Sequence, residues 1–160
     1  MRIGIGFDIH RLTAGRPLLL GGVTIPAQAG AEGHSDADVL LHALTDALLG
    51  AAGAGDIGTH FPDTDPKWKG AASGLFVAEA LRLAQQKGYR VANADLMVLA
   101  EAPKLVPFRE KIVGAVAALL KVEPGRVNFK ARTMERLGPI GEGRAIAAWV
   151  SVLLEPEGDR

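Results

Sequence analysis

Hydrophobic and polar side chains alternate along the first ten residues of the chain. Four apolar side chains occupy every second position and share one face of an extended segment: Ile3, Ile5, Phe7 and Ile9. The opposite face carries Arg2, two glycines, Asp8 and His10. This period of two predicts a β-strand with Asp8 and His10 on the same side. Residues 17–25 predict a hairpin, because two short apolar runs flank a Gly-Gly pair.

The hydrophobic spacing becomes helical after Ser35. This serine is the expected N-cap of a first helix, with Asp36 and Asp38 in the first turn and an end at Gly50. The apolar positions are those expected of a buried helix: Val39, Leu40, Leu41, Leu44, Leu48 and Leu49. A second helix is expected from an N-cap at Ser73 to Gly88. A third has Pro107 in its first turn and carries Ile112, Val116 and Leu119.

Three apolar segments predict additional strands, over residues 91–101, 127–131 and 145–154. Helices separate several of the strands, and no repeat or linker divides the chain. The predicted fold is therefore α/β, of the α+β type: a mixed sheet with about three helices on one face and an N-terminal hairpin. We expect residues 1–160 to form a single domain.

The composition narrows the classes of function. Eighteen basic residues balance eighteen acidic ones, so no bulk charge attracts nucleic acid or an anionic membrane surface. The chain lacks cysteine, which excludes disulfides and thiolate metal sites and is compatible with a reducing cytoplasm. The longest apolar run, residues 145–154, is shorter than the roughly 20 residues that a membrane helix needs. We expect a soluble, cytoplasmic protein whose metal ligands are His and carboxylate.

Asp8, His10 and His42 are the candidate metal ligands. Asp8 and His10 leave one strand face together, which suits a clamp for one ion but also suits an ordinary surface pair. His42 lies among leucines, so it is either a ligand or a core histidine satisfied by a neighbouring carboxylate. Asp38 and Asp46 lie one turn on either side of it, and either could hold its second ring nitrogen. Two histidines and one aspartate would suit zinc with an open fourth position.

Three other segments could bind an anion or a polar ligand. His34 and Ser35 precede a helix, where free N–H groups favour anions, although a simple serine cap explains them as well. A long loop carries Asp56 and Asp63, which could accept bonds from hydroxyl groups or merely face solvent. At predicted strand ends lie three charged or polar residues that suit phosphate and cation binding, or are ordinary solvated charge: Lys104, Thr133 and Glu135.

The order of these segments resembles the 2-C-methyl-D-erythritol 2,4-cyclodiphosphate synthase family of the non-mevalonate isoprenoid pathway. The matching segments run from the first strand almost to the C-terminus: GFDIHR at 6–11, GHSDADVLLHALTDALLG at 33–50, GDIGTHFPDTD at 55–65, KG at 69–70, APK at 102–104 and NFKARTMERLG at 128–138. The central block is too long for chance agreement.

The resemblance implies a homotrimer with active sites between subunits. Its substrate would be 4-diphosphocytidyl-2-C-methyl-D-erythritol 2-phosphate, and its products the cyclic diphosphate and CMP. It implies that Asp8, His10 and His42 bind zinc, or another divalent ion at the same site. Glu135 would bind a second ion, magnesium or manganese.

The resemblance also implies the contacts to substrate. The 2-phosphate end would meet His34 and Ser35. The erythritol part of the site would include Asp56, Ile57, Gly58, Phe61 and Asp63. The cytidine diphosphate would lie against Ala100, Lys104, Ala131, Arg132 and Thr133. Because the nucleophile is an ionised phosphate, no general base or covalent nucleophile is expected.

The chain departs from the usual family pattern at two places. Arg132 replaces a residue that is commonly threonine. Glu142 and Arg144 reverse the usual order of an Arg and a Glu near an axial cavity that accepts isoprenoid diphosphates in the family. We hypothesise that this reversal leaves catalysis intact but alters or abolishes the axial anion site. Two alternatives stay open: a zinc hydrolase using the same three ligands, and a trimeric small-molecule-binding module without catalysis.

Overall fold

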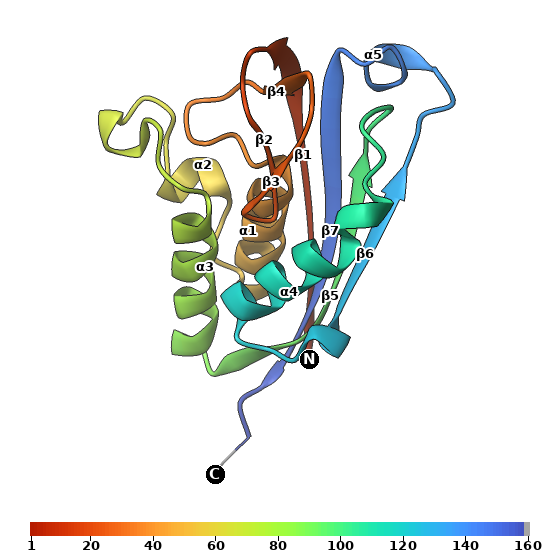
Figure 1. Ribbon diagram of the computed structural model, residues 1–160. Coiled ribbons are helices and arrows are strands. Elements are labelled where there is room, and N and C mark those ends of the chain that lie inside the picture. Colours follow the sequence, from red (N-terminus) through yellow and green to blue (C-terminus); the bar gives the residue numbers. More distant parts are fainter. Residues whose placement is uncertain (159–160) are drawn as a thin grey trace.

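A computed structural model describes residues 1–158 of the chain (Figure 1). Its main sheet has five strands in the order β4-β1-β7-β5-β6. In that order they span Ala29–Ala31, Arg2–Ala14, Ala145–Pro156, Tyr89–Leu99 and Val127–Arg132. The β5–β6 pair is parallel, whereas β1 pairs antiparallel with β4 and β7, and β5 pairs antiparallel with β7. The prediction of a mixed sheet is therefore confirmed.

Three long helices cover one face of this sheet (Figure 1). They are α1 (Val39–Ala52), α3 (Gly74–Gln86) and α4 (Arg109–Leu120). Two one-turn helices, α2 (Ile57–His60) and α5 (Gly138–Gly141), were not predicted, because four residues are too few to establish a helical period. Short 3₁₀ turns add Pro66–Trp68, Val106–Phe108 and Pro124–Arg126. The predicted arrangement of about three helices on one face holds for the long helices.

The predicted N-terminal hairpin is present as a separate two-stranded sheet. It pairs β2 (Leu18–Leu20) with β3 (Val23–Ile25) in antiparallel register. Gly21 and Gly22 form its turn with φ of 63° and 79°, values that side chains disfavour. The hairpin packs its buried leucines into the main core and supplies backbone donors next to α1.

The predicted boundaries of α1 are wrong at both ends. The helix starts at Val39 with Asp38 as its N-cap, because Ala37 has a left-handed backbone with φ of 57° and interrupts any turn that begins at Ser35. At the other end the helix continues through Gly50 and ends at Ala52, with Gly53 as the left-handed cap. Likewise, Pro107 lies in a 3₁₀ turn just before α4 rather than in its first turn.

The two faces of β1 have opposite environments. Gly4 and Gly6 are buried against α1, whereas the four apolar residues that alternate with them are exposed: Ile3 by 69%, Ile5 by 58%, Phe7 by 47% and Ile9 by 47%. Trp149 of β7 is 46% exposed beside them, with its ring 5.8 Å from that of Phe7. The uncovered face of the sheet therefore carries an apolar strip, here called the bare strip, made by Ile3, Ile5, Phe7, Ile9 and Trp149. Within the described part of the chain, none of the helices combines the length and the apolar character required to cross a bilayer.

Candidate functional site

Glycines in β1 let the strand lie against α1 at very short range. A Cβ on Gly6 would lie 1.9 Å from the carbonyl oxygen of Ala43, and a Cβ on Gly4 would lie 1.9 Å from that of Ala47. No side chain fits at such distances. This close approach is what lets the two polar residues of β1 reach a residue on the facing side of α1.

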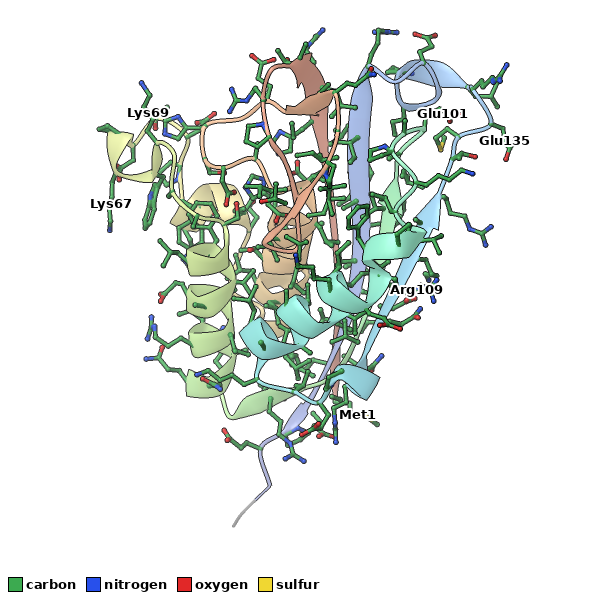
Figure 2. The ribbon with its side chains drawn as sticks, viewed as in Figure 1. Met1, Lys67, Lys69, Glu101, Arg109 and Glu135 are labelled. Carbon is green, nitrogen blue, oxygen red and sulfur yellow. The ribbon has the colours of Figure 1, made fainter. Side chains whose placement is uncertain are left out.

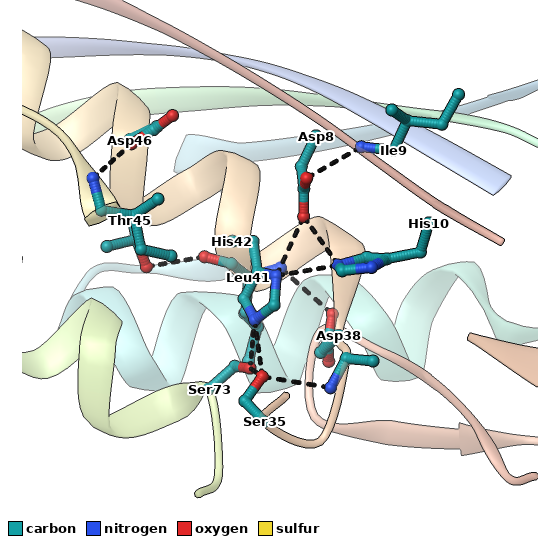
Figure 3. Close-up of polar contacts among 12 residues, drawn as sticks. Asp8, Ile9, His10, Ser35, Asp38, Leu41, His42, Thr45, Asp46 and Ser73 are labelled. Carbon is teal, nitrogen blue, oxygen red and sulfur yellow. Dashed lines mark hydrogen bonds and ion pairs between the residues drawn. The ribbon is translucent and has the colours of Figure 1, made fainter. Parts of the chain in front are cut away.

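Asp8 and His10 of β1 meet His42 of α1 at one point (Figure 3). The Asp8 Oδ2 atom lies 2.9 Å from His10 Nε2 and 2.9 Å from His42 Nδ1, and the two ring nitrogens are 3.0 Å apart. The side chains are partly buried, with exposures of 28% for Asp8, 16% for His10 and 12% for His42. The structure therefore brings His42 to the two strand residues, with its ring bonded to the carboxylate of Asp8.

The outer nitrogen of each ring has its own partner. His10 Nδ1 lies 2.8 Å from the carbonyl oxygen of Glu32, which can only accept, so this nitrogen carries the proton. His42 Nε2 lies 2.9 Å from the hydroxyls of both Ser35 and Ser73 (Figure 3). With the outer nitrogens bonded in this way, the inner nitrogens can direct lone pairs at Asp8 and at each other.

The prediction that Asp38 or Asp46 holds the second nitrogen of His42 is wrong. The carboxylate of Asp38 accepts from the backbone N–H groups of Gly21, Gly22 and Leu41, because it caps α1 and faces the hairpin turn. Asp46 accepts from the N–H of Ile57 at 2.7 Å and so fixes the start of α2. Neither carboxylate bonds the ring of His42, because each accepts hydrogen bonds from backbone N–H groups instead.

The electrostatics of the cluster favour a negative Asp8 beside a protonated or metal-bound His10. Burial raises the pKa of Asp8, but hydrogen bonds and attraction from His10 and His42 outweigh burial and hold the net pKa far below its usual range. Burial lowers the pKa of His10, yet its bond to Asp8 and the charge of Asp8 raise the net pKa above the usual value. The cluster therefore attracts positive charge at its centre.

The three residues fit a divalent ion. Each offers one ligand atom, and these atoms all lie within 4.8 Å of one another. Three lone pairs directed at one point repel unless a proton or a metal ion lies between them. Two imidazole nitrogens and one carboxylate oxygen are a common ligand set for transition metals.

The triad lies in a cavity of about 520 Å³ that gathers most of the residues predicted to bind the erythritol and 2-phosphate parts. The predicted residues in its wall are His34, Ser35, Ile57, Gly58, Phe61 and Asp63. Asp56 is the exception: it is exposed, and its Oδ1 accepts from the N–H and hydroxyl of Thr59 as the cap of α2.

Sequence reasoning missed two aromatic residues and a serine at this cavity. Trp68 and Phe76 line it, and the rings of Phe61 and Phe76 stack with centroids 4.5 Å apart. Phe76 falls within the predicted second helix but has no feature that marks it as a cavity residue, and Trp68 lies just before the KG pair in a segment without a periodic signal. Ser73 was predicted as a helix cap, and the sequence gives no sign that its hydroxyl reaches a residue 31 positions away.

A second group of predicted residues lies at the ends of β5 and β6. A cavity of about 150 Å³ is lined by Ala100, Lys104, Ala131, Arg132 and Thr133, all predicted to meet the nucleotide. Glu135 adjoins it, because its Oε1 accepts from the hydroxyl of Thr133 at 3.2 Å. The strand ends are tied together by the N–H of Ala100, which donates to the carbonyl of Arg132 at 3.0 Å.

The two groups are separated within one chain. The two cavities share no lining residue, and β7 and β5 lie between β1 and β6 in the sheet. In Figure 2 the labelled Glu101 and Glu135 lie at one edge of the molecule, and Lys67 and Lys69, beside the Trp68 wall of the triad cavity, at the opposite edge. A single chain therefore brings the triad and its cavity together, but not these with the nucleotide residues.

Comparison with known proteins links this geometry to one family. Residues 1–155 match the model of the YgbB family. The chain is 56% identical over 154 residues to the 2-C-methyl-D-erythritol 2,4-cyclodiphosphate synthase of Geobacillus kaustophilus, covering 96% of this chain and 98% of that one. A solved synthase structure in a CDP-bound form matches with a TM-score of 0.89 and 44% identity, covering 96% of this chain and all of that one. The bifunctional IspDF of Campylobacter jejuni matches with a TM-score of 0.93 and 44% identity, over 97% of this chain and 42% of that longer one.

Proposed function

Because the chain belongs to the YgbB family of 2-C-methyl-D-erythritol 2,4-cyclodiphosphate synthases, we infer that it forms this cyclic diphosphate, in the non-mevalonate pathway. Its substrate is 4-diphosphocytidyl-2-C-methyl-D-erythritol 2-phosphate, and CMP is released. The observation that carries this function is the convergence of Asp8, His10 and His42 in a cavity walled by His34, Ser35 and the loop after α1. These are the segments on which the family resemblance depends.

The reaction is an internal phosphoryl transfer. An oxygen of the 2-phosphate forms a bond to the β-phosphorus, the bond from that phosphorus to the oxygen bridging the two phosphates breaks, and CMP leaves with that oxygen. The nucleophile is already ionised, so the barrier lies mainly in bringing anions together in line. A divalent ion bound by the triad supplies charge neutralisation and Lewis acidity at the diphosphate. We assign this ion as zinc, and a second ion, magnesium or manganese, to Glu135.

The chain's own residues orient the substrate. We propose that Ser35 donates its hydroxyl proton to the 2-phosphate end, because its oxygen already accepts from the N–H of Ala37 at 3.2 Å. His34, in the same wall, supplies a second polar contact. The backbone near Gly58 and the carboxylate of Asp63, both in the cavity wall, would meet the erythritol hydroxyls. Asp56, which caps α2 outside that wall, would support this loop. The stacked rings of Phe61 and Phe76 exclude water from one side of the cavity.

We propose that the active sites form between subunits of a homotrimer. Two features of the single chain support it. The bare strip leaves five large apolar side chains exposed on one sheet face, which is unusual for a surface without a partner. The nucleotide residues lie apart from the triad, so a neighbour's Lys104, Arg132 and Thr133 would complete the site. An assembly that places the β5–β6 end of one subunit beside the triad of the next meets both requirements.

An axial cavity of that trimer is a further proposal, with isoprenoid diphosphate as its ligand. Arg144 donates to the carboxylate of Glu142 at 2.7 Å within one chain, and both side chains are more than half exposed. An arginine already paired in this way offers less charge to a diphosphate. Geranyl diphosphate titration should therefore give weak or absent binding. If geranyl diphosphate binds tightly, and binding is lost equally in Arg144→Ala and Glu142→Ala, the hypothesis that the reversed order alters the axial anion site is wrong.

Phosphorus NMR of the reaction tests the proposed function directly. The protein is incubated with the cytidylylated substrate and magnesium after zinc loading, and the expected products are the cyclic diphosphate and an equal amount of CMP. Linear phosphates would instead indicate a hydrolase. A parallel sample treated with chelator should lose the cyclic signal, and restored zinc should return it. Recovery of unchanged substrate from the zinc- and magnesium-loaded protein would contradict the assignment.

A further inference from the structure

Ser73 occupies a helix-capping position but does not cap its helix. It precedes α3, and no side-chain capping bond is formed. Its side chain is fully buried, with 0% exposure, so water does not satisfy the hydroxyl. The usual task of a serine here is to accept from the first free N–H groups of the helix. The hydroxyl is used instead between Asp36 and His42.

The direction of each hydrogen bond around Ser73 follows from its partners. The N–H of Ser73 donates to Asp36 Oδ2 at 3.0 Å, and the hydroxyl of Ser73 donates to Asp36 Oδ1. A carboxylate can only accept, so it takes the single hydroxyl proton of Ser73. The oxygen of Ser73 therefore presents lone pairs to His42 Nε2, which lies 2.9 Å away. This nitrogen must be the donor.

Ser35, like Ser73, accepts the proton on His42 Nε2, but its role differs. Its oxygen lies 2.9 Å from His42 Nε2 and also accepts from the N–H of Ala37. Ser35 faces the cavity, and its own proton is not committed to a carboxylate. Only Ser73, through Asp36, has its hydroxyl orientation fixed by charge. Figure 3 shows both serines on the side of the His42 ring opposite Asp8.

We propose that Asp36 and Ser73 are positioning residues for the metal site, here called the Asp36–Ser73 relay. Asp36 fixes the hydroxyl of Ser73, the hydroxyl holds the proton of His42 on Nε2, and the lone pair of Nδ1 stays directed at Asp8 and His10. Carboxylates bonded directly to metal-binding histidines act in this way, and here a serine is inserted between the two. The inference rests on the proposed function only in that the triad binds a divalent ion.

Asp36→Asn provides the sharpest change, because it alters the relay while keeping the shape of the side chain. Asp36 accepts from the N–H of Ser73 at Oδ2, and from the N–H of Asp38 and the hydroxyl of Ser73 at Oδ1. The single amide oxygen of asparagine can serve only one of these two positions. With the oxygen toward the hydroxyl, the neutral amide holds the proton of Ser73 less strongly than the carboxylate does. With the oxygen toward the N–H of Ser73, the NH₂ group donates to the Ser73 oxygen, and the hydroxyl proton is displaced toward His42 Nε2, which favours the ring form that is protonated on Nδ1. That form has no lone pair for the metal.

The test is a zinc(II) titration of the intact protein against a competing chelator, repeated with cobalt(II). Ser73→Ala and Asp36→Asn should each weaken binding by about 10- to 100-fold, the usual cost of losing an outer contact to a ligand. Ser73→Thr keeps the hydroxyl and should bind within a few-fold of the unchanged protein, even if its added methyl group lowers stability. Thr45→Val is the matched control: Thr45 is also fully buried and bonds only the carbonyl of Leu41.

A spectroscopic measurement separates positioning from stability. In the zinc-loaded protein the ring proton on His42 Nε2 should give a downfield NMR signal that moves or disappears in Ser73→Ala and Asp36→Asn, but stays in Thr45→Val. If the two relay variants bind zinc as tightly as Thr45→Val and keep this signal, the relay is wrong while the metal site stands. If the unchanged protein binds neither metal, the metal part of the proposed function fails first.

Discussion

The triad cavity and the nucleotide cavity differ in how completely one chain builds them. The triad side chains are at most 28% exposed, and their ring nitrogens have partners that fix their orientation. Lys104, Arg132, Thr133 and Glu135 are all exposed, and their cavity is less than a third as large. A buried, oriented cluster suits a metal that must be held rigidly. An open cluster of polar ends suits a surface that a second subunit completes.

The difference arises from local packing. The triad lies where β1 and α1 are pressed together by glycine contacts, so little side-chain freedom remains. The nucleotide residues follow the ends of β5 and β6, where the chain leaves the sheet. Glu135 even adopts a left-handed backbone, with φ of 50°.

The largest effect is expected from His42→Ala. Loss of one of three ligands should abolish tight zinc binding and cyclisation. This loss exceeds the decrease of about 10- to 100-fold that is typical when an outer contact to a ligand is removed. The protein should stay folded, because the alanine leaves the backbone of α1 unchanged. Chelator titration and phosphorus NMR measure the two losses.

The matched control is His60→Ala. His60 lies on α2 and bonds the carbonyl of Ala54 at 2.7 Å, outside the triad. Its loss should leave zinc content unchanged. A metal-free His42→Ala protein with full activity would refute the role of the triad.

The next effect is recovery of activity by mixing two inactive variants. His42→Ala damages the triad half and Glu135→Gln the nucleotide half, so neither alone should cyclise substrate. If neighbouring subunits share each site, random mixed trimers contain about a quarter of sites with both halves intact. Unfolding the two proteins together and refolding them should then restore about a quarter of the activity.

Two refolded single variants, assayed separately, are the control for this mixing experiment. Absence of any recovery from an assembly that is shown to be mixed would mean that both halves act within one chain.

A smaller effect is expected from acid. The pKa of Asp8 is held low, so this carboxylate stays ionised at neutral and mildly acidic pH. The raised pKa of His10 means that its ring takes up a proton above the ordinary imidazole range of about 6.5, and that proton competes with the metal. Zinc affinity should therefore fall as the pH drops through the pKa of His10, by about tenfold per unit below it. An affinity independent of pH between about 5 and 8 would contradict this competition.

The smallest effects are expected from two residues that stabilise the fold, Asp38 near the triad and Asp95 on β5. Asp38 is fully buried and accepts from three N–H groups beside α1, so Asp38→Asn should lower the free energy of unfolding by about 1–3 kcal/mol. Asp95 of β5 pairs with Lys130 of β6 near the surface, so Asp95→Asn should cost less than about 1 kcal/mol. Thermal unfolding at one fixed protein concentration measures both, because assembly stability depends on concentration. Equal losses would contradict the contrast in burial.

The pH dependence of the Asp95 contribution has a definite sign. Burial raises the pKa of Asp95, but hydrogen bonds from Lys130 and Asn128 outweigh it and lower the net pKa. The small stabilisation is therefore present above the ordinary carboxyl pKa and is lost as the pH falls through the lowered value. In Asp95→Asn this acid-dependent part should be absent.

Short-range patterns along the chain predict the fold class and the order of the long helices and strands, but not β4, α2 or α5. The period of two in β1, the leucine spacing of α1 and the Gly-Gly hairpin each depend on neighbours a few positions apart, and all three are present. The family segments also identified Asp8, His10 and His42 together, because a long ordered match carries information that spacing alone lacks. Boundaries such as the start of α1 were missed, since the left-handed Ala37 has no residue-type signal.

Which polar groups meet depends on the packing of segments that are distant in the sequence. Asp38 and Asp46 are one helical turn from His42, yet they bond backbone N–H groups of the hairpin and of α2. Ser73 is 31 positions away and bonds its ring. Helical spacing restricts where a side chain starts but not which donor satisfies it, and buried polar groups bond whatever partner the packing of distant segments places within reach. For the same reason, the alternation in β1 does not show which face is covered. The packing of Gly4 and Gly6 against α1 leaves the apolar face exposed.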